Sequence, residues 1–268
     1  MSSQKQSNIG AEMTFWEHVE VLRKVIFRCI GVWFFFAIAA FCLKDQIFSV
    51  IFAPSRSDFV LYTILCRISA YIGIESLCPE DFKIMFINTE LASQFMVHLQ
   101  MSACVGLVFA LPYLVFELYG FVSPALYDNE RHYSFSLIFF SFFLFFTGVL
   151  LNYFVIFPFS FRFLSTYQVN ADVVNQIALS SYTSTFLLLS VLLGLLFEIP
   201  IVAYFLAKLN VINADMLRKY RKHAIVVICI LAAIITPTAD IFTLLLVALP
   251  IFLLYECSIF IVKNVNVN

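Results

Sequence analysis

Long apolar blocks constrain this chain more than any other feature of its sequence. Several of them approach or exceed the roughly 20 apolar residues that a helix needs to cross a bilayer core. Apolar residues make up 62% of the chain and charged residues 12%, which is about half of the charged fraction of a soluble domain. The chain is therefore predicted to be an all-α integral membrane protein. Its net charge of −1 gives no sign of nucleic-acid binding.

The apolar blocks predict six transmembrane helices in a single membrane domain over residues 1–268. The fifth has only 12 apolar residues, Ala224–Ile235, before Thr236 and Pro237, about 18 Å of helix, and the sixth contains Pro250. Two short or interrupted spans in succession suggest a locally thinned bilayer. The expected spans are residues 25–43, 91–116, 133–157, 183–207, 224–237 and 241–262.

A long segment outside the membrane, residues 44–89, follows the first span and predicts a structured cap with short helices. Pro54 is expected to be a structural residue of this cap. Among the seven cysteines, only Cys66 and Cys78 share a segment outside the membrane, so a disulfide could form there. No C-x-x-C pair or histidine set predicts a metal site, and no nucleophile with a base, or pair of aspartates within spans, predicts catalysis. No cofactor and no enzymatic activity are expected.

The distribution of lysine and arginine predicts that both termini are cytoplasmic. With six spans, the N-terminus, the second and fourth loops and the tail share one side of the membrane. That side holds eleven of the 16 basic residues, and most of the other five lie in the long cap segment. Cytoplasmic loops of membrane proteins carry the excess of basic residues.

Between the second and third spans lies a polar segment, Phe121–Arg131, with the sequence F-V-S-P-A-L-Y-D-N-E-R. Ser123 followed by Pro124 is a helix-start signature, since proline lacks an N–H and presets φ for the first helical position. A short helix would then carry Glu130 and Arg131 just outside the membrane, on the cytoplasmic side. This polar segment is the predicted place where the protein meets its substrate.

Glu198 is the most costly residue for a membrane protein to accommodate. It lies in the middle of the fourth span, where an unpaired carboxylate costs about 3 kcal/mol or more, and such positions are functional candidates. A second interpretation is a protonated glutamate that hydrogen-bonds a neighbouring helix, with Pro200 kinking the span. The two interpretations are compatible.

Glu20 and Glu130 are both expected at the cytoplasmic edge of the membrane. A carboxylate can take a guanidinium in a bidentate pair, so two of them suit a ligand with two arginines. The residues alone favour a plainer interpretation, in which these acids interact with helix dipoles or form solvated ion pairs. Asp240, which follows a proline-containing turn, is expected to cap the last helix.

Several ordered motifs make the chain resemble the TatC family, the polytopic component of the twin-arginine protein translocase. The resemblance runs from about residue 14 to residue 262, and its most specific match is the polar segment. The other motifs are, in chain order, H-V-E-V-L-R-K at His18–Lys24, F-A-P at Phe52–Pro54, Y-F-V-I-F-P at Tyr153–Pro158, G-L-L-F-E-I-P at Gly194–Pro200, T-P-T-A-D at Thr236–Asp240, A-L-P at Ala248–Pro250 and Y-E at Tyr255–Glu256.

The resemblance implies a receptor for folded precursor proteins whose signal peptides carry consecutive arginines. Glu130 would be a main determinant of arginine-pair recognition, and Glu198 would face the concave side where single-span TatA- or TatB-like partners and the signal peptide engage. An oligomeric complex in the cell inner membrane, with transport driven by the protonmotive force, is also implied. The other residues expected at the signal-peptide site are Glu20, Arg23, Phe121, Pro124, Tyr127 and Arg131.

One position departs from the family motif, which usually has an acid immediately before L-R. This chain has Val21 there. Glu20 is one residue earlier, about 100° around a helix. Either Glu20 takes over the role from a different angle, or Glu130 carries more of the recognition.

A second functional class remains, in which the chain is a proton-coupled small-molecule transporter with Glu198 as the proton carrier. Against this class, the six predicted spans show no obvious internal repeat of the kind that many transporters carry.

Overall fold

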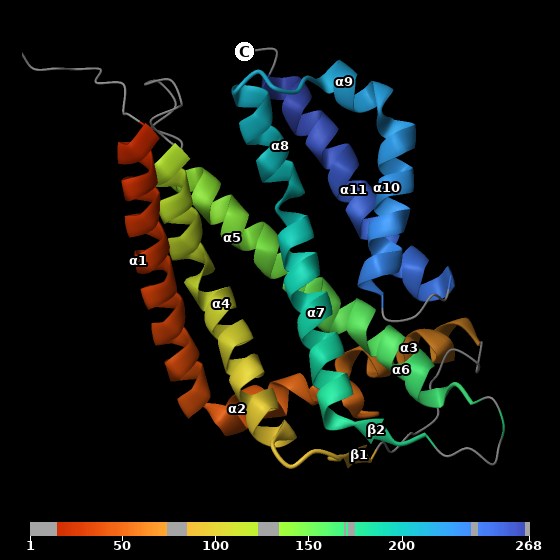
Figure 1. Cartoon of the computed structure of the whole chain (residues 1–268). Coiled ribbons are helices and arrows are strands. Elements are labelled where there is room, and N and C mark those ends of the chain that lie inside the picture. The colour runs from red at the N-terminus through yellow and green to blue at the C-terminus, as the bar shows by residue number, and fades with distance from the viewer. Residues whose placement is uncertain are drawn as a thin grey trace, which may run out of the picture.

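Long helices, closed at one end by short ones, make up the protein (Figure 1). The computed structural model describes residues 15–73, 85–122, 134–168, 170, 175–236 and 241–265. The N-terminal end of the bundle, at the top of Figure 1, holds the start of α1 (Phe15–Cys42), the end of α4 (Ser93–Val122) and the helix α9 (Ala214–Lys219). The cap end holds α2 (Lys44–Ile51), α3 (Val60–Ile72) and the two strands.

The predicted all-α membrane fold with six spans is confirmed. The described part of the chain has six helices that are long and apolar enough to cross a membrane. The first two spans correspond to α1 (Phe15–Cys42) and α4 (Ser93–Val122), which lie side by side along their lengths. The fourth is α7 (Leu179–Phe197) continued by α8 (Ile199–Lys208), so the expected interruption at Glu198 is present.

The third span is longer than expected. It was predicted to end before Pro158, but α5 (Ser134–Leu151) continues through a π-helical turn, Asn152–Ile156, into α6 (Phe157–Thr166). Pro158 lies in the first turn of α6. The wider π turn before it accommodates both the missing N–H of proline and the contact of its ring with a preceding carbonyl. The prediction that this proline ends the helix is wrong.

The last two spans form a hairpin. The fifth, α10 (Arg221–Ile235), has 15 residues, about 22 Å of helix, and is short as predicted. It follows the small helix α9 (Ala214–Lys219). The sixth was predicted to be short as well, and this prediction is wrong: α11 (Ile241–Val265) has 25 residues, because Pro250 is accommodated inside the helix and does not end it.

In its described part, residues 44–73 and 85–89, the predicted cap contains short helices. Lys44–Ile72 is apolar enough to count among the six candidate spans, but it is divided into α2 (Lys44–Ile51), a 3₁₀ turn (Ala53–Ser55) and α3 (Val60–Ile72). These pieces lie across the lower end of the bundle in Figure 1. The short helix α10, with 15 residues, is not among these six candidates.

Hydrogen bonds and a small sheet attach the cap to the spans. The hydroxyl of Tyr62 donates to the carbonyl of Pro158 at 3.0 Å, and that of Tyr182 donates to the carbonyl of Ile51 at 2.7 Å. The expected structural residue Pro54 is buried in the 3₁₀ turn. Strands β1 (Phe86–Ile87) and β2 (Ile177–Ala178) pair in parallel and join the cap segment to the start of α7.

Glycines set how closely the spans pack. A Cβ on Gly106 of α4 would lie 2.6 Å from the backbone nitrogen of Ala37 on α1, and one on Gly194 of α7 would lie 2.6 Å from the Phe145 ring of α5. The outer faces are apolar and exposed, with Phe35 67% exposed, as expected for surfaces that face lipid.

Candidate functional site

The polar segment begins at the N-terminal end of the bundle. Helix α4 carries the chain there as far as Val122, and the Phe121 side chain is partly buried. Four residues predicted for the signal-peptide site lie outside the described residues, namely Pro124, Tyr127, Glu130 and Arg131. Asp240, the predicted cap of the last helix, also lies outside the described residues.

The start of α1 lies at the same end and carries two more of the predicted residues. Glu20 Oε1 is 3.0 Å from Lys24 Nζ, and both side chains are more than half exposed. Arg23 is exposed, and Val21 is 37% exposed. Glu20 therefore forms an ion pair within its own helix, and solvated pairs of this kind contribute little to stability.

The order of contacts between α1 and α4 brings these residues near the level of Phe121, the first residue of the polar segment. Starting at the cap end, Phe41 stacks on His98, Phe36 stacks on Phe109, and the Arg28 guanidinium lies 3.5 Å from the Glu117 carboxylate. The two helices are antiparallel and pack residue against residue along this whole length. If the same pairing continues for one further helical turn toward the N-terminal end, Lys24 is level with Phe121.

A polar cluster between α1 and α4 was not predicted from the sequence. Glu117 is only 9% exposed, and its Oε1 accepts a 2.6 Å hydrogen bond from the Tyr113 hydroxyl in addition to the contact with Arg28. From the sequence, Glu117 only marked the end of an apolar run. The available signal was a pair of opposite charges at the end predicted to be cytoplasmic, with Arg28 just inside the first predicted span and Glu117 directly after the second.

Glu198 lies at the junction between α7 and α8, where the sequence predicted a break. The Ser141 hydroxyl of α5 donates to its Oε2 at 2.7 Å. Its Oε1 is buried and has no hydrogen-bond partner among the described residues. Glu198 can therefore accept one more hydrogen bond at Oε1, from a partner helix or from a ligand.

Another charged pair at the N-terminal end holds the last hairpin together. Arg221 donates through Nη2 to Glu256 Oε2, which links α10 to α11, and the Tyr255 hydroxyl donates to the Leu217 carbonyl of α9 at 2.7 Å. These contacts hold α9 and the start of α10 against α11.

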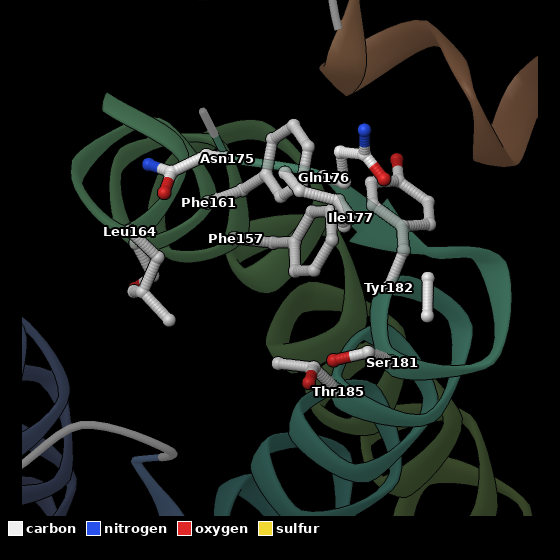
Figure 2. Close-up of a pocket in the computed structure, with 11 residues that line it drawn as sticks. Phe157, Phe161, Leu164, Asn175, Gln176, Ile177, Ser181, Tyr182 and Thr185 are labelled. Carbon is white, nitrogen blue, oxygen red and sulfur yellow. The ribbon is translucent and has the colours of Figure 1, made fainter. Parts of the chain in front are cut away.

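A cavity of about 380 Å³ opens at the cap end, at the opposite end of the bundle from Glu20, Arg23 and Phe121. Phe157, Phe161 and Tyr182 form an aromatic wall, and amide and hydroxyl side chains, including Asn175 and Ser181, line the rest (Figure 2). Of the residues predicted for signal-peptide binding, the three that the structure describes, Glu20, Arg23 and Phe121, do not line it.

The chain is similar to known proteins in sequence and in fold. The family model described as Sec-independent protein translocase protein (TatC) matches residues 17–250. The Sec-independent protein translocase protein TatC of Blattabacterium sp. subsp. Periplaneta americana is 34% identical over 253 residues, which cover 93% of this chain and 95% of that protein. The protein of the same name from Helicobacter pylori (strain J99) is 40% identical over 171 residues, 64% of this chain and 68% of that protein.

Two solved structures share the fold. They are described as the crystal structure of the twin arginine translocase receptor TatC and the crystal structure of this receptor in DDM, with TM-scores of 0.72 and 0.74. Sequence identity is 29% and 28%, and the matches cover 93% and 92% of this chain and 100% of each solved chain. Sequence motifs, family model, relatives and fold agree, and the chain belongs to the TatC family of Sec-independent protein translocase proteins.

Proposed function

We propose that this protein is the signal-peptide receptor and core subunit of a twin-arginine translocase. It lies in the cell inner membrane, with the N-terminal end of the bundle facing the cytoplasm. At that end it binds the signal peptides of folded precursors. Glu130 is the main carboxylate for the arginine pair, with Phe121, Pro124, Tyr127 and Arg131 around it, and Glu20 and Arg23 are secondary contacts.

The observation that carries this proposal is the antiparallel packing of α1 on α4. It supports a common site, because the turn of α1 that holds Glu20, Arg23 and Lys24 lies level with Phe121, where the polar segment starts. The engagement of Glu20 with Lys24 supports a secondary role for that carboxylate. Glu130 then carries most of the recognition, which fits the valine at position 21.

Glu198 serves as the intramembrane contact for single-span TatA- or TatB-like partners. Its unpaired Oε1 supports this role, because a hydrogen bond from a partner helix would satisfy a buried acceptor. In this proposal the partners assemble around several copies of the chain, and the protonmotive force drives export. A substrate-dependent proton flux in liposomes that contain this chain alone would instead favour the transporter class.

Co-purification tests the site. Membranes that contain the wild-type protein or Glu130→Ala are mixed with a precursor whose signal peptide carries Arg-Arg. The variant is expected to insert normally and to lose at least about tenfold in precursor recovery, since a charge-assisted bidentate pair is removed. Glu90→Ala, at the cap end, is the matched control and is expected to bind like wild type. Unchanged recovery with Glu130→Ala would remove Glu130 from the site.

A further inference from the structure

We propose that Glu117 is an exchangeable guanidinium site. In the resting protein the site is occupied by Arg28, and an arginine of the signal peptide displaces that residue. The proposal rests on the proposed function, since it adds a second carboxylate to the same recognition surface.

The Glu117 carboxylate is held in place. Its side chain is 11% exposed, and the Tyr113 hydroxyl, one helical turn earlier on α4, donates to Oε1 at 2.6 Å. A carboxylate this deeply buried needs a cationic partner, because burial of an unpaired charge is costly. The site therefore selects for a cation in every state of the protein.

Its present partner is loosely held. The Arg28 side chain is 62% exposed, and its Nη1 lies 3.5 Å from Glu117 Oε1. A guanidinium in its best arrangement donates two parallel hydrogen bonds of about 2.8 Å to both oxygens of a carboxylate. An incoming arginine can form that bidentate pair, while the long stem of Arg28 lets its head move to the membrane interface.

The position of the site suits a signal peptide. Val21, Lys24 and Arg28 lie on one face of α1, because they are spaced three and four residues apart. Glu117 therefore faces the side of α1 on which the family motif has an acid, about two helical turns further into the membrane than Val21. Phe121 is four residues after Glu117, so both lie on the same side of α4. Glu117 thus supplies a carboxylate on the face where Val21 leaves none.

The test measures binding of a fluorescent Arg-Arg signal peptide and its Lys-Lys counterpart to the full-length protein in lipid nanodiscs. Glu117→Gln is expected to weaken binding of the Arg-Arg peptide about tenfold and to reduce its preference over Lys-Lys. Arg28→Gln is expected to have the opposite effect and to tighten Arg-Arg binding several-fold, because the competing guanidinium is gone. Glu256→Gln, which also removes an acid paired with an arginine at this end, is the control and should bind like wild type.

The opposite signs separate exchange from a structural role. If the pair only holds α1 against α4, both variants weaken binding together, and that result overturns the proposal. Wild-type affinity in Glu117→Gln would overturn it as well. A gain of affinity in Arg28→Gln cannot come from misfolding, so poor folding of Glu117→Gln does not obscure the outcome. Absence of any Arg-Arg preference in the wild-type protein would instead overturn the proposed function, and this inference with it.

Discussion

The hydrogen bond from Ser141 to Glu198 shows how a single residue fixes a costly group inside the bundle. Ser141 is 2% exposed and donates across the α5–α7 interface to an acceptor 57 residues away. Ser141→Ala removes this donor, and we expect a loss of about 1 kcal/mol in the free energy of unfolding, within the range for hydrogen bonds between membrane helices. Thermal unfolding of the purified protein in detergent measures the change.

The control for this prediction lies one helix away. The Ser184 hydroxyl on α7 donates only to the carbonyl of Ser181 within its own helix, at 3.2 Å, and it is exposed. Ser184→Ala should leave the melting temperature nearly unchanged. Equal melting temperatures for the two variants would contradict the assignment of a stabilising role to the Ser141–Glu198 bond.

At the residue scale, sequence reasoning succeeds where a residue contrasts with its surroundings. Glu198 was predicted to be a special position because it interrupts a long apolar run. Its donor Ser141 could not be predicted, since an isolated serine inside a span has no signal of its own. Glu117 was overlooked because it lies near the end of an apolar run, where placing a charge costs little free energy.

Between elements, the contact of α1 with α4 depends on one glycine. Gly106→Ala would bring a Cβ to 2.6 Å from a backbone nitrogen of Ala37, and a backbone atom cannot move aside alone. We expect destabilisation of about 1–3 kcal/mol, the usual effect of overpacking, and weaker retention of the α1–α4 geometry on which the proposed site depends. Gly31→Ala on α1 is the matched control, because a Cβ at this position would meet nothing within 4 Å among the described residues.

Melting temperatures in detergent distinguish the two variants. Gly31→Ala should be neutral or slightly stabilising, because alanine is the better helix former. A Gly106→Ala protein that melts at the wild-type temperature would show that α1 and α4 are not packed as closely as described.

The cap carries a covalent link that the sequence left open. Cys66 is disulfide-bonded, and Cys78, the partner considered from the sequence, lies outside the described residues. Cys29, Cys42, Cys104, Cys229 and Cys257 are free. Alkylation of the denatured protein without reductant should therefore label five cysteines, and prior reduction should raise the number to the full seven.

Intact-mass measurement reads this difference directly. Cys78→Ser should free Cys66 for labelling in the unreduced protein, which identifies the partner. Seven labelled cysteines without reductant would contradict the disulfide.

Element ends were harder to predict than the elements themselves. The apolar runs indicated each span, but Pro158 was expected to end the third. The π turn just before Pro158 accommodates it, and that turn depends on packing that the sequence pattern does not show. The pairing of Phe86–Ile87 with Ile177–Ala178 was likewise not predictable, since strands of two residues have no usable alternation.

For the whole molecule, the number of spans and the cap followed from composition and hydropathy, because the bilayer restricts the chain to helices of a given length. The relation between α1 and α4 could not follow from the same reasoning, since lipid-facing and helix-facing residues are equally apolar. That relation brings the start of α1 near the end of α4, where the polar segment begins.

In the proposed function, the arginine pair of a signal peptide is recognised at the N-terminal end of the bundle, around the polar segment. A precursor with a photoreactive amino acid beside its arginine pair, crosslinked to the protein in native membranes and mapped by mass spectrometry, tests this most directly. We predict adducts in residues 117–131 and in the first turns of α1 for an Arg-Arg precursor, and a strong reduction for Lys-Lys. Adducts at the cap end alone, or equal adducts with both precursors, would contradict the account.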